Sequence, residues 1–360
     1  MSDEFISLER PEEVGIGVTI NDTGIHVTGI VTATTFVGDG SNLSNTGAFN
    51  YDNATNIFSQ NITSLPSRTT GVNNFFAGFN AGKSITSGSN NIGIGTSAGA
   101  SITDGFGNNF LGKGAGRCTT TGYDNNFFGQ CAGRYNTNGH NNNFFGYAAG
   151  YSNTDGFLNN FIGYYAGCLN TFGLYNNFFG SYAGRCNRTG SHNTFIGHCA
   201  GRGIGFFGVT GSNNIAIGQQ AGVFLKNGIG NILMGCCAGS SSSNTGLSGF
   251  NNVALGDFAG SKLTSGSYNN FFGYGAGACN TTGCNNNFFG KFAGYLNTTG
   301  LHNNFLGACA GACNTTGCYN NFLGGYAGYC NTTGSRNNFF GDQAGTRNTT
   351  GNHNNFFGCL

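Results

Sequence analysis

The chain has 360 residues and a formal net charge of +1, with 67 Gly, 2 Pro and no Trp. Charged residues make up only 8% of it, against about 25% in ordinary globular proteins. With 35 Phe to bury, this composition excludes a disordered linker and a collagen-like chain, and it favours a repetitive fold.

The first part of the chain, residues 1–70, differs in charge from the rest. It carries 2 basic and 8 acidic residues, whereas residues 71–360 carry 12 basic and 5 acidic ones. We therefore expect two regions: a β-rich N-terminal attachment or folding-start region over 1–70, and a repeat domain over 71–360.

Basic residues are scattered along the chain rather than clustered, so we expect no nucleic-acid partner. The opening stretch MSDEFISLERPEEVG lacks a basic segment followed by an apolar one, and no run approaches about 18 apolar residues. We expect neither Sec-dependent export nor membrane insertion.

From residue 76 onward a unit close to NFFGxxAGxxNTTGxxx recurs. Its spacing is 17 residues, except for two intervals of 21. Aligned on the first residue of the FF pair, the units begin at Phe76, Gly93, Phe110, Phe127, Phe144, Phe161, Phe178, Phe195, Ala216, Leu233, Ala254, Phe271, Phe288, Phe305, Phe322, Phe339 and Phe356.

A 17-residue period is too short for helix-pair repeats, and so many Gly residues penalise helices by about 1 kcal/mol each. We predict an all-β fold, a β-solenoid (β-roll) of about 17 coils. Each coil would hold a strand around NFFG, a corner at the following Gly, a short segment at AG and a turn at NTTG.

Neighbouring strand residues point to opposite faces, so the two residues of each FF pair need different surroundings. The second position is almost always large, and we predict that it forms the core ladder of each chain: Ile94, Leu111, Phe128, Phe145, Ile162, Phe179, Ile196, Ile217, Phe272, Phe289, Leu306, Leu323 and Phe340. The first position would then form a subunit-interface ladder: Phe110, Phe127, Phe144, Phe161, Phe178, Phe271, Phe288, Phe305, Phe322 and Phe339. In the four units with Gly93, Ala216, Leu233 or Ala254, we expect the preceding Ile or Val to supply the missing core volume.

Two small or polar features repeat with the coils. The AG step keeps Ala and Gly from Ala81-Gly82 to Ala344-Gly345, which indicates a crowded inner corner. The Asn residues of NNFF and NTTG would stack from coil to coil in asparagine ladders that exchange amide hydrogen bonds.

The repeats hold little that points to catalysis. Their five carboxylates, Asp104, Asp124, Asp155, Asp257 and Asp342, form no pair suited to acid–base chemistry. His140, His192, His302 and His353 never fall in consecutive coils. We therefore predict no catalytic residue, no metal site and no cofactor, and a structural protein rather than an enzyme.

Cysteine is the remaining chemical feature, with 14 residues. Two units read CNTTGC, so Cys279 with Cys284, and Cys313 with Cys318, are candidate disulfides across a four-residue turn. The alternative is that Cys serves as a small apolar residue in crowded places.

NNIAIGQQAG and NNVALGDFAG resemble the head repeats of trimeric autotransporter adhesins, and NTTGSRNNFFGDQAG resembles the repeat arrays of phage tail-fibre-like proteins. The resemblance implies a left-handed parallel β-roll in a three-chain bundle. The sequence shows no stretch that resembles the adhesins' coiled-coil stalk, C-terminal membrane anchor or self-cleaving chaperone domain, so we expect a virion or filament setting.

Together these features predict a structural fibre or adhesin subunit. The expected form is a phage tail fibre or virion appendage made of a stiff homotrimeric rod, located on the virion or outside the cell. The chain itself is the expected partner, and 1–70 would bind a baseplate or other carrier; no host receptor is identified. A self-polymerising extracellular filament and an ice- or surface-binding solenoid are the alternatives.

Overall fold

The structure is a computed structural model that describes residues 70–358, apart from 204–207 and 242–244, and the backbone of four strands before residue 70. The chain divides into two units, Met1–Thr46 and Gly47–Leu360. In the first unit, β1 (Gly17–Asn21) pairs antiparallel with β2 (Gly24–Thr28). The rest of the predicted N-terminal region lies outside the described residues, apart from β3 and β4.

The second unit begins earlier than the repeats do. β3 (Asn50–Asp52) pairs antiparallel with β4 (Asn56–Ser59), and β4 pairs parallel with β5 (Phe75–Ala77). The sheet of the repeat domain therefore starts before residue 71.

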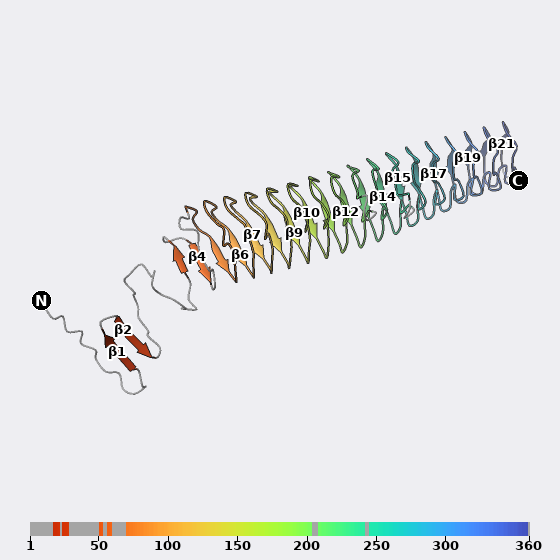
Figure 1. Cartoon of the computed structure of the whole chain (residues 1–360). Helices are drawn as coiled ribbons and strands as arrows, with labels where there is room; N and C mark the ends of the chain where they lie inside the picture. Colours follow the sequence, from red (N-terminus) through yellow and green to blue (C-terminus); the bar gives the residue numbers. More distant parts are fainter. Residues whose placement is uncertain are drawn as a thin grey trace. The chain divides into compact units, whose positions relative to one another are not determined.

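Each repeat contributes one strand of three residues. After β5 these are β6 (Ile92–Ile94), β7 (Asn109–Leu111), β8 (Asn126–Phe128), β9 (Asn143–Phe145), β10 (Asn160–Ile162), β11 (Asn177–Phe179), β12 (Thr194–Ile196), β13 (Ile215–Ile217), β14 (Ile232–Met234), β15 (Val253–Leu255), β16 (Asn270–Phe272), β17 (Asn287–Phe289), β18 (Asn304–Leu306), β19 (Asn321–Leu323), β20 (Asn338–Phe340) and β21 (Asn355–Phe357). The parallel strands follow one another along the repeat domain (Figure 1). The predicted all-β solenoid with a 17-residue repeat is confirmed, and the described residues contain no helix.

Successive strands stay in register throughout this stack. Asn287 pairs with Asn304, and Phe288 with Phe305, one coil later. The two 21-residue intervals keep the register as well, since Thr194 pairs with Ile215 and Ile232 with Val253. The two longer intervals therefore leave the strand register unchanged.

The first corner after each strand stacks backbone directly on backbone. Gly290 has a φ of +141°, and a Cβ there would lie 2.5 Å from the carbonyl oxygen of Gly307 in the next coil. Only glycine fits this close approach, which explains why NFFG ends in Gly.

The middle residue of each strand points into the coil. Its Phe rings stack face to face along the axis, with centroids 4.8 Å apart between Phe288 and Phe305 and 4.7 Å between Phe322 and Phe339. The Ala of every AG step is buried beside this stack. The predicted crowded inner corner is confirmed.

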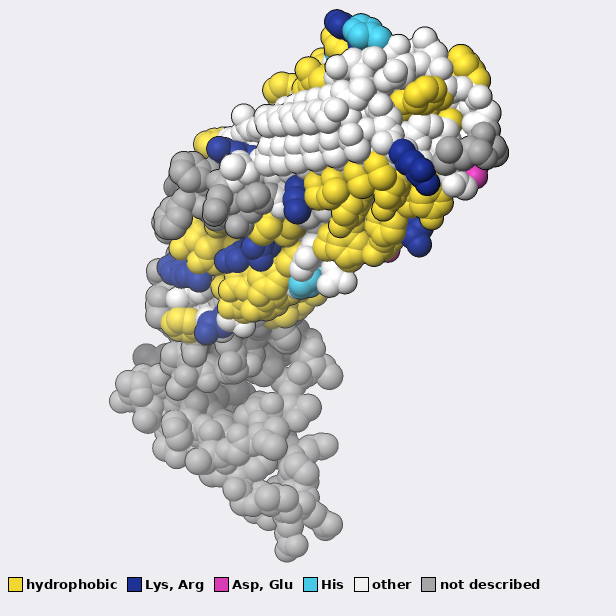
Figure 2. Space-filling model, turned by 90° about the vertical axis from the view of Figure 1, so that its right-hand side faces the viewer, with side chains coloured by type: hydrophobic (Ala, Val, Ile, Leu, Met, Phe, Trp, Pro, Cys, Tyr) yellow, Lys and Arg dark blue, Asp and Glu magenta, His cyan; other side chains and the backbone are white. Residues whose placement is uncertain are grey.

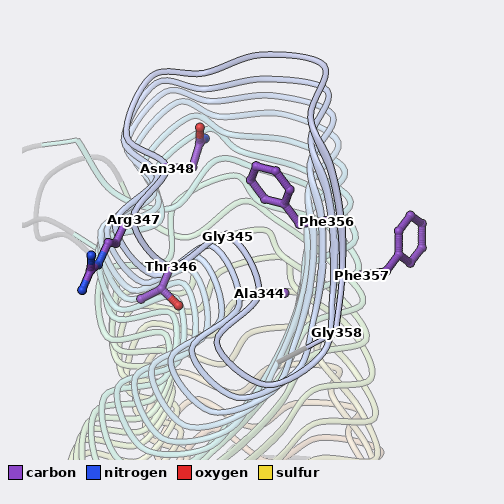
Figure 3. A pocket seen from close by; sticks show the side chains of 8 residues that line it. All are labelled: Ala344, Gly345, Thr346, Arg347, Asn348, Phe356, Phe357 and Gly358. Carbon is purple, nitrogen blue, oxygen red and sulfur yellow. The ribbon is translucent and has the colours of Figure 1, made fainter. Parts of the chain in front are cut away.

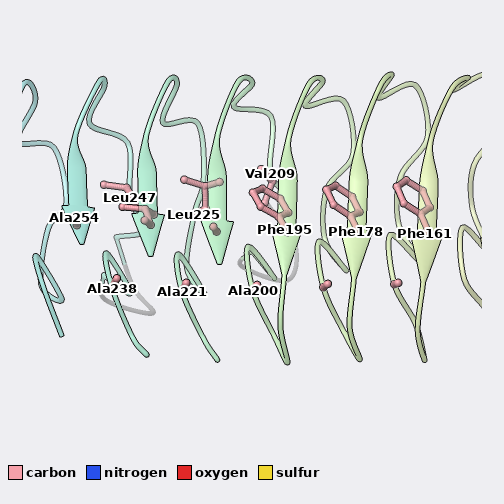
Figure 4. Packing of buried hydrophobic residues seen from close by; sticks show 14 of the residues in the cluster. Phe161, Phe178, Phe195, Ala200, Val209, Ala221, Leu225, Ala238, Leu247 and Ala254 are labelled. Atoms are coloured by element: carbon pink, nitrogen blue, oxygen red, sulfur yellow. The ribbon is translucent and has the colours of Figure 1, made fainter. Parts of the chain in front are cut away.

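Where the middle residue is small, the far side of the coil fills the core. In β13 and β15 the middle residues are Ala216 and Ala254, and Figure 4 shows Leu225 and Leu247 reaching into this part of the interior. Leu225 and Leu247 are fully buried. The expectation that the preceding Ile or Val supplies this volume is wrong, because strand geometry turns that residue outward; Ile92, for instance, is 38% exposed.

Three asparagine ladders connect the coils, as predicted. The first Asn of NNFF is fully buried: Asn303 Oδ1 accepts hydrogen bonds from the backbone N–H of Asn320, at 3.0 Å, and from its Nδ2, at 3.1 Å. The second Asn forms a half-buried outer ladder, with Asn304 Nδ2 donating to Asn321 Oδ1 at 2.8 Å. The NTTG Asn residues form a third ladder across the coil.

Candidate functional surface

The sheet presents one continuous outward surface, which we call the outer strand face. It consists of a leading row, the first residue of each strand from β5 to β21, and a trailing row, the third residue of each strand. Eleven of the seventeen leading residues are Asn, and every trailing residue is apolar. Neither row contains a charged residue.

The trailing row leaves much apolar surface in contact with solvent. Its members Ile94, Phe145, Ile162, Phe179, Ile196, Met234, Phe289 and Leu306 are each between 36% and 41% exposed. Figure 2 shows hydrophobic stripes running along the stack beside pale rows of uncharged side chains and backbone. Such a long apolar row is unusual on a chain that stays single.

The structure reverses the predicted assignment of the two Phe ladders. The predicted interface residues are fully buried in the chain's own core: Phe110, Phe127, Phe144, Phe161, Phe178, Phe271, Phe288, Phe305, Phe322 and Phe339. The predicted core residues form the trailing row instead: Ile94, Leu111, Phe128, Phe145, Ile162, Phe179, Ile196, Ile217, Phe272, Phe289, Leu306, Leu323 and Phe340. The first position tolerates small residues because the opposite turn compensates for them, not because it lies outside.

The sequence held a signal for the correct assignment. The residue two positions before the first Phe is Asn in all seventeen units, whereas the residue between them varies among Asn, Phe, Ile, Thr and Val. A position that never changes belongs to the interior ladder. Since side chains alternate along a strand, the first Phe must share that interior face.

Aromatic side chains form further rows outside the strands. Phe106, Tyr123, His140 and Phe157 stack on consecutive coils, with centroids 4.5 to 4.8 Å apart. Their ring faces cover one another, so these rows serve packing between coils more than they offer flat rings to a ligand.

Tyr165 belongs to a second cluster of aromatic side chains. Its ring makes an edge contact with that of Tyr147 at 5.4 Å, and the neighbouring Tyr147 side chain, together with partial desolvation, raises the pKa of Tyr165 to about 12. The Arg185 guanidinium lies 5.7 Å from the ring centroid of Tyr165 and 5.5 Å from that of Tyr182. These contacts fasten consecutive coils to one another.

The predicted turn disulfides are absent. Cys279, Cys284, Cys313 and Cys318 are all free thiols. Cys284 Sγ accepts a hydrogen bond from the backbone N–H of Ser267 and donates to the carbonyl of Thr282. Ser267 Oγ makes the same two kinds of contact, with Phe250 and Ser265. Cys284 therefore takes the place of a turn serine and does not face Cys279 as a bonding partner.

The other candidate ligands remain apart. Asp104 accepts hydrogen bonds from Ser87 and Thr86, which hold the pKa of its carboxyl below its usual range. His302 stacks on Tyr319 at 4.9 Å. Across the described residues, no three His, Cys, Asp or Glu side chains gather in a metal-binding arrangement. The same part of the chain contains no helix long and apolar enough to cross a membrane.

The described pockets are shallow features of the coil surface. One, of about 370 Å³, opens on the last described coil between the Ala344–Asn348 segment and the end of β21 (Figure 3). Its lining includes Phe356 and Phe357, which are 43% and 75% exposed. A second, of about 260 Å³, lies among Phe258, Tyr274 and Phe292. Neither contains a nucleophile next to a base.

Comparison with protein-family models, curated proteins and solved structures found no match.

Proposed function

We propose that this chain is a structural subunit: a stiff rod in a fibre or appendage, carried on a virion or another extracellular particle. The observation that carries the proposal is the unbroken register from β5 to β21. Each coil is joined to the next by backbone pairing, by asparagine ladders and by stacked core side chains. Bending the stack would break several of these contacts at once.

The outer strand face supports a role in assembly. An apolar row repeated on seventeen coils favours burial against another surface of the same length. The sequence predicts a homotrimer held together by the first-position Phe ladder, but that ladder lies inside the chain. Rods that associate would therefore have to use the outward-facing trailing row, and self-association through this row is part of the proposal.

The alternative of an ice- or surface-binding solenoid draws less support. Many Thr hydroxyls at the NTTG turn are engaged within the stack: those of Thr281 and Thr298 donate to carbonyl groups of the following coil at 3.1 and 3.0 Å. These groups are not displayed as a free array.

Electron micrographs and small-angle scattering of the purified protein test the proposal. Seventeen coils at about 4.8 Å give a rod of roughly 80 Å for the repeat domain. We expect discrete rods of this length, or virion-bound fibres with the same width as the rods. A compact particle would contradict the proposal, and endless filaments would favour the self-polymerising alternative.

A further inference from the structure

The outer strand face has a pattern along its length that identifies its occupant. We propose that it packs against the same face of a second copy of this chain, with the two solenoid axes antiparallel and a twofold axis passing between β13 and β14. This inference rests on the proposed structural role and names the partner of that surface.

Face-to-face packing of two identical sheets allows two orientations. A twofold axis along the solenoid would set the leading row of one copy against the trailing row of the other, so Asn would face apolar side chains. A twofold axis along the strands sets leading row on leading row and trailing row on trailing row. Only the second arrangement buries the apolar row against itself, as dry sheet interfaces require.

The leading row shows where that axis lies. Its centre holds four residues that are not Asn: Thr194, Ile215, Ile232 and Val253. Five consecutive Asn precede them, on β7–β11, and six follow, on β16–β21. Between β7 and β20, Asn would therefore face Asn, and the four central residues would face one another, about a point between β13 and β14; at the ends, Ile92 of β6 would face Asn355 of β21. The two 21-residue intervals, β12 to β13 and β14 to β15, flank the same point symmetrically.

The outer coils of the trailing row have complementary sizes about the same axis. Antiparallel pairing places β10 opposite β17, β9 opposite β18, and so on outward to β6 opposite β21. Five successive pairs then each join one Phe to one smaller aliphatic residue: Ile162 with Phe289, Phe145 with Leu306, Phe128 with Leu323, Leu111 with Phe340, and Ile94 with Phe357. Over these five pairs, matching large with small keeps the two sheets at a constant separation. Nearer the axis, Phe179 would face Phe272, Ile196 would face Leu255, and Ile217 would face Met234.

The charges at the rim agree with this register. The second residue after each trailing residue lies beyond the glycine corner, and four of these are charged: Lys113, Asp257, Lys291 and Asp342. Lys113 follows β7 and would lie opposite Asp342, which follows β20. Asp257 would lie opposite His198, and Lys291 opposite the ring of Tyr164, so no like charges face each other.

The area is also sufficient. Sixteen paired coils spaced 4.8 Å apart, each presenting a strand about 10 Å long, give about 800 Å² per copy, which is what each partner buries in a standard-size interface. The surface is therefore large enough for a specific two-chain particle.

Cross-linking tests the register on the unmodified protein. A carbodiimide activates a carboxylate, and a neighbouring amine displaces the urea by-product to form an amide. Lys113 and Asp342 lie thirteen coils apart in one chain, about 60 Å, so a direct link between them requires two chains. We expect this link in a mixture of ¹⁵N-labelled and unlabelled protein, with peptides of mixed isotope content. An associated sample without it would overturn the proposed register.

Variants test the same pairing by sedimentation. Ile217→Asp places two carboxylates beside the axis and should weaken association by about 100-fold or more. Phe172→Asp is the control: Phe172 is 57% exposed on the NTTG side, and the variant should associate normally. Lys113→Asp alone should weaken association by about 5-fold to 10-fold, and adding Asp342→Lys should restore it. Circular dichroism identifies any variant that fails to fold, and the restoring pair remains decisive.

The outcomes separate this inference from the proposed function. If the protein is a single chain that still forms an 80 Å rod in micrographs, the proposed pairing is wrong but the structural role stands. A three-chain particle, or a double charge exchange that restores nothing, also ends the twofold pairing alone. A compact particle would contradict both the pairing and the structural role.

Discussion

Gly294 lies directly against the ring of Phe288, the core residue of its own coil. A Cβ on Gly294 would be 2.4 Å from Cε2 of Phe288, and its φ of +57° is in the left-handed region. The AG step is therefore fixed by two constraints at once, a backbone conformation and the absence of a side chain. The same contact recurs in other coils, for example between Gly328 and Phe322.

Gly294→Ala should lower the free energy of unfolding by about 2–4 kcal/mol, because the left-handed backbone costs about 1–2 kcal/mol and the clash with the ring adds to it. Hydrogen exchange at the amides of β17 and β18 measures the loss. Gly114→Ala is the matched control: its φ is +68°, but the nearest side-chain atom to its Cβ is Cys131 Sγ at 3.8 Å. Gly114→Ala should therefore cost only the free energy of the left-handed backbone. Equal losses of stability in the two variants would show that the Phe288 ring does not constrain Gly294.

The two residues of one FF pair should respond differently to truncation. Phe288 is fully buried and Phe289 is 39% exposed. Phe288→Ala should destabilise a single chain by about 3–5 kcal/mol through the cavity it leaves. Phe289→Ala should cost only about 1 kcal/mol in dilute, unassociated protein, because it removes a half-exposed ring whose stacking partner is Phe272, at 4.6 Å. Chemical denaturation compares the two. A larger loss of stability for Phe289→Ala would mean that Phe289, and not Phe288, faces the core.

The solenoid could be predicted from the sequence because its period is explicit. Seventeen units, the invariant AG step and the recurring Asn residues each require stacked coils, and all three are present in the structure. Whether a residue faces in or out could not be settled by size alone. Phe288 and Phe289 are the same residue type, and only the unvarying Asn286 two positions earlier indicates which of them lies inside.

The turn cysteines show another limit of sequence reasoning. The spacing of Cys279 and Cys284 fits a short disulfide loop, but the orientation of each side chain depends on the turn. In the fold, Cys284 Sγ occupies the position of a serine hydroxyl and hydrogen-bonds to the neighbouring coil. Sequence spacing carries no information about that direction. In the same way, the charged residues beyond the glycine corners can be matched across an interface only once the strands are aligned.

The inner asparagine ladder should be far less tolerant of change than the outer one. Asn303 donates to the carbonyl of Gly317 at 2.7 Å, and its backbone N–H donates to Asn286 Oδ1 at 3.0 Å. Asn303→Leu removes the donor to Gly317 and the acceptor for Asn320, leaving buried polar groups unpaired. We expect a loss of about 3 kcal/mol or more.

The neighbouring outer Asn provides the control. Asn304 is half-buried and takes part in one side-chain ladder, so Asn304→Leu should cost less than about 1 kcal/mol in the single chain. Melting followed by circular dichroism compares the two variants. Similar melting temperatures would mean that the interior ladder contributes no more than the surface one.

The last prediction concerns Cys168, a thiol that is only 6% exposed. Burial raises the pKa of Cys168 from 9.0 to about 11, with Arg185 opposing the shift. The folded state thus disfavours the thiolate: the stability linked to this group is complete below pH 9 and is lost as the pH rises from 9 through about 11. At pH 9 a thiol with a pKa of 11 is ionised about 50-fold less than an unperturbed one. Iodoacetamide should therefore alkylate Cys168 at least that much more slowly in the folded protein than in urea, as measured by peptide mass spectrometry. Equal rates in the two states would mean that this part of the stack opens readily and that Cys168 is not held in the interior.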